Sequence, residues 1–441
     1  MRRLAALLLV AATLAGCNEA QSFFGFGTYK KPLAGERISI LQLNQTESAD
    51  PALADVKVLL PQPFENPDWP EPGGYPSHAM QHLALSAQPT VAWTSNIGAG
   101  ANSDRWLLSE PVVAGGRVFV MDARSRVSAF DAHSGVQAWR VNLAKDVPSG
   151  KLLGGGVSFD GGRIFAGTSF GQVVALDPAS GKEIWRKDVH GPMRAAPAAA
   201  SGRIFAVTID NVLHVLAEDD GRELWTHSGL AVPAGMLGTA TPAVQGSVVV
   251  VVYSSGEIYG LKVDTGRTLW TDTLAGQLRG GSTETIADIR GRPVIDRDYV
   301  IAISHSGIMA ALDARRGERV WDADFGGIHS PWVAGDYVFV LTDDQELICL
   351  TRAQGHVRWV AGLPKYENPP DNTRPILWQG PVLAGNRLIL TGTDGKAVAV
   401  SPYTGKLLGE IDLPSATHLP PVVAGNTLYI LSDNADLVAL R

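Results

Sequence analysis

Residues 110–122 read EPVVAGGRVFVMD and residues 420–433 read PPVVAGNTLYILSD, so two distant parts of the chain share one pattern. A proline or a small residue is followed by an apolar pair, a glycine-containing turn and an alternating apolar run, which is typical of a β-hairpin. The pattern occurs eight times in all, and the other six copies begin at Gly156, Ala196, Thr241, Arg292, Ser330 and Gly380. A repeat of this kind predicts an architecture built from one recurring unit.

A second pattern follows each of the first seven hairpins: a short strand, a turn that ends in glycine, three residues, and then a tryptophan. Residues 129–139, AFDAHSGVQAW, show it in full, and the seventh copy carries Gly409 where the others have tryptophan. A buried indole contributes a large apolar area and needs a partner for its N–H group. We therefore expect a tryptophan on the outer strand of each unit to dock onto the neighbouring sheet. The expected set is Trp93, Trp139, Trp185, Trp225, Trp270, Trp321 and Trp359.

Together the two patterns supply four strands per repeat, which is one blade of a propeller. The eighth copy ends at Arg441 after its third strand, and residues 89–95, PTVAWTS, offer the missing fourth strand. Pairing the two ends removes exposed strand edges, which otherwise favour aggregation. The sequence predicts an all-β fold, an eight-bladed β-propeller of four-stranded blades over residues 89–441. A seven-bladed ring is the structural alternative.

Composition agrees with this fold and excludes one class of function. The 441 residues are 45% hydrophobic and 18% charged, and 48 are glycines, which suits many short strands joined by tight turns. The formal net charge is −7, so no basic footprint indicates nucleic-acid binding.

The N-terminus predicts a lipid anchor. Arg2 and Arg3 precede an apolar stretch that is too short to span a membrane, and Leu14-Ala-Gly-Cys17 places two small residues directly before a cysteine. Residues 1–16 are thus expected to be a lipoprotein signal peptide, with Cys17 as the acylated first residue; an ordinary secretory signal is the alternative. The proline-rich residues 17–88 are expected to form a tether with little regular structure. Removal of residues 18–85 is therefore expected to leave a folded domain.

Signals for chemistry are few. Cys349 lies in an alternating apolar run and is expected to be a buried small hydrophobe. His78 and His82 have the i, i+4 spacing of two zinc ligands on a helix, but no third ligand lies nearby in the sequence, so surface histidines are the favoured interpretation. No catalytic residue, metal site or cofactor is predicted.

The pattern of residues 175–185, ALDPASGKEIW, resembles the repeats of propellers that bind pyrroloquinoline quinone (PQQ). Together with the lipoprotein signal, the AWTSNIGAG segment at 92–100 and the LGGGV segment at 153–157, it resembles the BamB lipoprotein family of the outer-membrane β-barrel assembly machinery. This resemblance implies a non-enzymatic periplasmic scaffold that is lipid-anchored on the periplasmic face of the cell outer membrane. A PQQ-dependent periplasmic dehydrogenase is the alternative, although the adjacent cysteine pair of that class is missing.

The resemblance also implies a partner, the periplasmic domains of the central barrel-insertion subunit, and a contact region on two loops. At the matching positions stand Met236, where the family has an apolar residue, and Asp288, where it has an acid. Leu237 stands where an arginine is expected, and Arg290 stands where a second acid is expected. These four residues are the expected partner-binding residues, with ordinary solvated loops as the alternative.

Overall fold

The protein was examined as a computed structural model that describes residues 48–53, 56–144, 154–232, 235, 236, 238, 240–276 and 287–441. The propeller and the proline-rich stretch from residue 56 onwards lie in one compact unit that extends from Thr46 to Arg441. Within the described residues, none of the helices has the length and apolar character that crossing a membrane requires.

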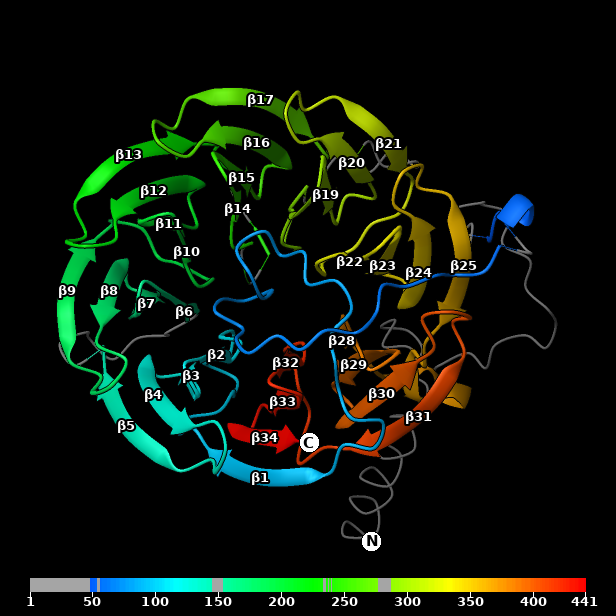
Figure 1. The fold of residues 1–441 in the computed structure, drawn as a ribbon, viewed down its shortest axis with the longest axis horizontal. Coiled ribbons are helices and arrows are strands. Elements are labelled where there is room, and N and C mark those ends of the chain that lie inside the picture. The colour runs from blue at the N-terminus through cyan, green and yellow to red at the C-terminus, as the bar shows by residue number, and fades with distance from the viewer. Residues whose placement is uncertain are drawn as a thin grey trace, which may run out of the picture. The chain divides into compact units, whose positions relative to one another are not determined.

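The predicted fold is confirmed: eight four-stranded antiparallel sheets stand around a common centre as the blades of a propeller (Figure 1). The first four blades consist of β2 (Val112–Ala114), β3 (Arg117–Met121), β4 (Arg126–Asp131) and β5 (Gln137–Asn142); β6 (Gly155–Asp160), β7 (Arg163–Thr168), β8 (Gln172–Leu176) and β9 (Glu183–Asp188); β10 (Ala198–Ala200), β11 (Arg203–Val207), β12 (Val212–Ala217) and β13 (Glu223–Ser228); and β14 (Ala243–Gln245), β15 (Val248–Val252), β16 (Glu257–Lys262) and β17 (Thr268–Thr273).

The next three blades consist of β18 (Val294–Asp296), β19 (Tyr299–Ile303), β20 (Met309–Asp313) and β21 (Arg319–Ala323); β22 (Trp332–Ala334), β23 (Tyr337–Leu341), β24 (Glu346–Thr351) and β25 (Val357–Gly362); and β28 (Trp378–Ala384), β29 (Arg387–Gly392), β30 (Lys396–Val400) and β31 (Leu407–Asp412). The small hairpin of β26 (Tyr366–Asn368) and β27 (Thr373–Pro375) and two short 3₁₀ turns, η1 (Pro51–Leu53) and η2 (Pro369–Asp371), lie outside the blades.

The eighth blade joins the first and the last strand of the propeller. It contains β32 (Val422–Ala424), β33 (Thr427–Leu431) and β34 (Asp436–Leu440), and its outer strand is β1 (Val91–Asn96). Trp93 pairs with Ala439, and the backbones of Thr90 and Arg441 exchange two hydrogen bonds of 2.7 and 2.9 Å. Closure by pairing of the terminal strands is therefore confirmed.

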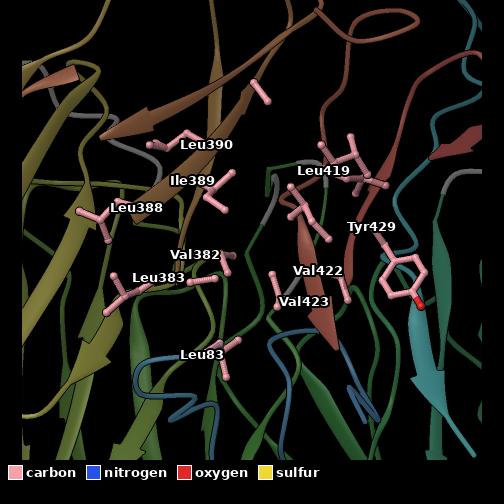
Figure 2. Close-up of a cluster of buried hydrophobic side chains, with 14 of the residues drawn as sticks. Leu83, Val382, Leu383, Leu388, Ile389, Leu390, Leu419, Val422, Val423 and Tyr429 are labelled. Carbon is pink, nitrogen blue, oxygen red and sulfur yellow. The ribbon is translucent and has the colours of Figure 1, made fainter. Parts of the chain in front are cut away.

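The core lies between neighbouring blades. The three inner strands of a blade are almost wholly buried, whereas outer strands such as β5 and β9 alternate exposed and half-buried residues. Figure 2 shows the arrangement between the seventh and eighth blades, where Val382 of β28 and Val423 of β32 lie in the space between the two innermost strands. Apolar alternation on both faces of each inner strand is what lets every sheet pack against two neighbours.

The seven predicted tryptophans each link two blades. Every indole N–H donates to a backbone carbonyl in the adjacent blade at 2.8–3.2 Å, and each ring lies against the glycine of that blade's outer turn. The acceptors, in ring order from Trp93, are the carbonyls of Ala132, Pro178, Glu218, Val263, Ala314, Arg352 and Pro402. The seam between the seventh and eighth blades has Gly409 at this position, and a cavity of about 440 Å³ lies beside it.

The proline-rich segment differs from the predicted tether. Residues 66–83, which we call the plug, lie across the centre of the ring (blue in Figure 1) and bury Trp69, Met80 and Leu83 almost completely. The plug hydrogen-bonds to the innermost strand of all eight blades. The bonds are Asn66 to Val423, Trp69 to Val113, Pro70 to Phe159, Glu71 to Ala199, Pro76 to Val244, Ser77 to Ile295, Gln81 to Trp332 and Leu83 to Leu383.

The innermost strands surround a central channel along the axis of the ring. The plug closes one end of this channel, because it bonds to the hairpin turns at which the innermost strands end. The amide N–H groups of Gly115, Gly385 and Gly425 in these turns donate to Asp68, Leu83 and Asn66. The segment has almost no regular secondary structure, as its prolines predict, yet it is an integral part of the fold. The rest of the expected tether, residues 17–47, lies outside the described residues.

Candidate functional site

The candidate site lies on the channel axis, above the plug and among the loops that lead into the innermost strands. A cavity of about 110 Å³ has Trp69, Gly73 and His78 of the plug in its lining. Its walls come from residues that precede the innermost strands of several blades, among them Glu110, Arg194, Arg290, Arg292, His329 and His418. Polar side chains from distant parts of the sequence therefore meet at one place.

Three of the four expected partner-binding residues meet beside this cavity. The backbone N–H of Met236 donates to Oδ2 of Asp288 at 2.6 Å, and Nη1 of Arg194 donates to the Met236 carbonyl at 3.0 Å. The Arg290 guanidinium lines the cavity, and its charge acts on Asp288. The fourth, Leu237, lies outside the described residues.

Asp288 is a buried carboxylate. Its side chain is only 3% exposed, and burial raises its pKa, against the Met236 amide and the charge of Arg290, which both lower it. Met236 belongs to none of the described strands, so its N–H has no partner in a sheet, and the Asp288 carboxylate accepts from it instead. Burial likewise lowers the pKa of Arg290, which the charge of Asp288 partly offsets.

One buried ion pair lies in the walls and another in the plug, and hydrogen bonds of His78 and Glu71 join the plug to the walls. Nη2 of Arg292 lies 2.7 Å from Oε1 of Glu110, and Nε2 of His78 lies 3.5 Å from Oε1 of Glu71. Nδ1 of His78 donates to the Pro293 carbonyl at 2.7 Å, because a carbonyl can only accept. Burial raises the pKa of Glu71, while its contacts with His78 lower it.

The histidine pair does not form a metal site. His82 directs Nδ1 to the Pro61 carbonyl at 2.8 Å, and its Nε2 accepts the Asn386 amide at 3.1 Å. Both histidines are buried, so the expectation of surface histidines is wrong. Within the described residues, no cluster of three or more histidine, cysteine or acidic side chains could hold a metal ion. Cys349 on β24 is fully buried, and burial raises the pKa of its thiol.

Comparison with known proteins identifies the family. The model of the family "Outer membrane protein assembly factor BamB" matches residues 81–152 and 123–361 of the chain. The chain belongs to the BamB family. It is 30% identical to the BamB of Alkalilimnicola ehrlichii over 351 residues, which are 79% of this chain and 87% of that protein. It is 25% identical to the BamB of Yersinia pestis over 358 residues, which are 80% of this chain and 88% of that protein.

Solved structures agree on the fold. BamB from Moraxella catarrhalis superposes with a TM-score of 0.67 at 20% identity, over 80% of this chain and all of that one. The quinohemoprotein alcohol dehydrogenase from Comamonas testosteroni superposes with a TM-score of 0.66 at 15% identity, over 85% of this chain and 80% of that one. At such identities both likenesses concern the fold alone, so the fold does not separate a scaffold from an enzyme.

The sequence analysis did not single out the residues of the axial cavity. Glu110, Arg292, His329 and His418 each stand one to three residues before the proline that opens a hairpin repeat. Alignment of the repeats would have shown that polar residues recur just before the innermost strands, next to the axis. No such register exists for the plug, because it has no repeat.

Proposed function

We propose that the protein is a non-enzymatic scaffold lipoprotein of the outer-membrane β-barrel assembly machinery. Membership of the BamB family carries this proposal, because relatives named as outer membrane protein assembly factors match about four-fifths of the chain. The eight-bladed ring, latched at seven seams and closed by its terminal strands, supports it as a rigid body that presents loops to a partner. In this proposal Cys17 carries the lipid that holds the protein at the periplasmic face of the outer membrane.

The proposed partner is the periplasmic part of the central barrel-insertion subunit, and the proposed contact region is the surface around Met236, Leu237 and Arg290. Asp288 has a supporting role here, since its carboxylate fixes the Met236 backbone instead of facing a partner. A loop residue whose backbone N–H and carbonyl are both hydrogen-bonded holds its side chain in a fixed place, so an apolar side chain there is preorganised for binding. The half-buried Met236 meets this description.

The PQQ-dependent dehydrogenase has less support. The cavity on the axis measures about 110 Å³, whereas pockets for drug-sized ligands usually measure about 300–1,000 Å³. The plug fills the space below it with Trp69 and Met80, two large side chains. The residues present therefore do not fit a tricyclic quinone, and no catalytic step through such a cofactor is derived.

Binding of the purified full-length protein to the purified periplasmic domains of the barrel-insertion subunit tests the proposal. The variant Leu237→Asp with Arg290→Gln should bind at least tenfold more weakly, because hot-spot substitutions cost about 2 kcal/mol or more each. Glutamine is chosen at Arg290 because a glutamate would place a second acid beside buried Asp288. The matched control is Arg315→Gln, on an exposed turn that ends in Gly317.

The variant and the control should melt at the same temperature as the wild type. Wild-type affinity in the folded double variant would place the contact elsewhere on the propeller. Absence of binding by the wild type would refute the partner itself.

A further inference from the structure

The lining of the axial cavity carries an excess of positive charge. Three arginines, Arg194, Arg290 and Arg292, stand against one carboxylate, Glu110, among the residues that line it. Behind the lining, Asp288 and Glu71 lie near the arginines, and burial raises the pKa of both carboxyl groups, which disfavours their charged forms. His329 adds no charge, because burial, together with the charges of Arg290 and Arg292, lowers its pKa to about 3. The wall therefore favours a ligand with negative charge.

Several polar atoms in this lining are buried and have no hydrogen-bond partner within the described structure. One of them, Nε2 of His78, faces Oε1 of Glu71 at 3.5 Å. The other three are the indole Nε1 of Trp69, Nε of Arg292 and Oε2 of Glu110, and the Trp69 and Glu110 residues are 2% and 5% exposed. Buried polar groups in native proteins nearly always have partners, so an unsatisfied set around one cavity indicates a missing group. Two of these atoms are donors, and the third accepts.

Glycines keep the space beside the arginines open. At Gly73, which has a φ of +90°, a Cβ atom would lie 2.8 Å from Nε of Arg292. At Gly238, which has a φ of +101°, a Cβ atom would lie 3.0 Å from Nε of Arg290. The first glycine belongs to the plug and the second to a blade loop, so at both places the missing side chain leaves room for an arginine that lines the cavity.

The unsatisfied atoms define the ligand's chemistry. Donors on Trp69 and Arg292 require acceptor oxygens on the ligand, and the unpaired oxygen of Glu110 requires a donor on it. Near neutral pH, phosphate is an anion that still carries at least one proton, whereas sulfate carries none. A phosphate group meets both demands, and a cavity of about 110 Å³ accommodates one tetrahedral oxyanion.

We propose that the axial cavity is a binding site for a protonated phosphate group, held by the Trp69 indole N–H and the Arg292 and Arg290 guanidinium groups, with Glu110 accepting the ligand's proton-bearing oxygen. The site shares Arg290 with the proposed contact surface, and phosphate binding is measured below without any partner, so each proposal can fail alone. Free inorganic phosphate and a small phosphate monoester share this chemistry, and the size of the cavity favours the free ion.

The test is titration calorimetry of the full-length protein in detergent, with inorganic phosphate, glycerol phosphate and sulfate at one pH and ionic strength. The wild type should bind phosphate saturably and at least tenfold more tightly than sulfate. Phosphate that binds more tightly than glycerol phosphate supports the free ion, whereas the reverse order supports a monoester. Wild-type protein that binds neither phosphate compound overturns the proposal.

Two variants test the assigned roles. Trp69→Phe keeps the ring that stacks on Trp332 but removes the indole N–H, so phosphate affinity should fall about tenfold. Glu110→Gln removes the charge that opposes a fully ionised anion, so sulfate should then bind about as well as phosphate. The matched control is Trp378→Phe, a buried indole that bonds to Pro364 and does not line the cavity; it should leave phosphate affinity unchanged.

Melting temperatures without phosphate separate folding from binding in each variant. The assigned site is contradicted if folded Trp69→Phe protein keeps its affinity for phosphate. It is also contradicted if folded Glu110→Gln protein keeps the wild-type preference for phosphate over sulfate.

Discussion

Replacement of Leu83 by alanine tests whether the plug is part of the fold. The Leu83 side chain is fully buried near Val382 and Val423 (Figure 2), and its backbone bonds to Leu383 and Gly385. Truncation of a buried leucine to alanine costs about 2–5 kcal/mol, because apolar contacts are lost and a cavity remains. We expect Leu83→Ala to lower the free energy of unfolding by this amount.

The same segment provides the control. Leu59 lies a few residues upstream of the plug and is 75% exposed, so Leu59→Ala should change the free energy of unfolding by less than about 0.5 kcal/mol. Differential scanning calorimetry makes the comparison. With an unfolding entropy of about 2.1 cal/mol/K per residue, a domain of this size should lose about 2–6 °C in Tm from Leu83→Ala and under about 1 °C from Leu59→Ala.

Equal melting temperatures for the two variants would refute this reasoning. Such a result would mean that the segment contributes no packing energy and behaves as a tether, as its composition predicts. It would also mean that the plug does not form a fixed wall of the axial cavity.

Three further predictions concern the seams, the loops and the anchor. Gly355→Ala and Gly202→Ala both place alanine at a φ of +70°, but only the Cβ at 355 meets an indole, that of Trp321, at 2.6 Å. Calorimetry should show a larger loss of unfolding free energy for Gly355→Ala. Equal losses would contradict the role of the tryptophan in joining the blades. The hydrogen bond that His305 makes to the Asp343 carboxylate raises the pKa of His305. This pair therefore stabilises the fold fully below about pH 6.5, and the stabilisation is lost as pH rises through the raised pKa. Asp343→Asn should lower the free energy of unfolding more at pH 6 than at pH 9, and a difference that does not depend on pH would contradict this. Cys17→Ser should abolish labelling by a fatty-acid probe and release the protein from membranes; persistent label on the variant would exclude acylation at this position.

The propeller could be predicted from the sequence because its information is local and repeated. Each blade restates the same hairpin and the same glycine-to-tryptophan spacing, so eight weak signals reinforce one another. The closure followed from counting strands: the last repeat lacks its fourth strand, and the segment around Trp93 supplies it. Even the irregular seam was visible, as Gly409 in place of tryptophan.

The plug and the cavity could not be predicted in the same way. A proline-rich composition indicates an irregular backbone correctly, but it does not reveal whether that backbone has partners. The partners of Trp69 and Leu83 are strands far away in the sequence, such as β2 and β28, and no period links them. The burial of Asp288 could not be predicted for a related reason, since the Met236 N–H that donates to it lies 52 residues away.

The plug also bears on the order in which the molecule can assemble. Its residues leave the ribosome before any blade, whereas β32 and β34, which it and β1 need as partners, are made last. Asn66 bonds to Val423, 357 residues away. The first and last strands of the propeller must also meet, where Thr90 bonds to Arg441. Contacts of such sequence separation carry a large loop-closure cost and slow folding. The plug therefore cannot complete its bonds until the final strands are made, and the full ring of contacts around it marks the end of assembly and not its beginning.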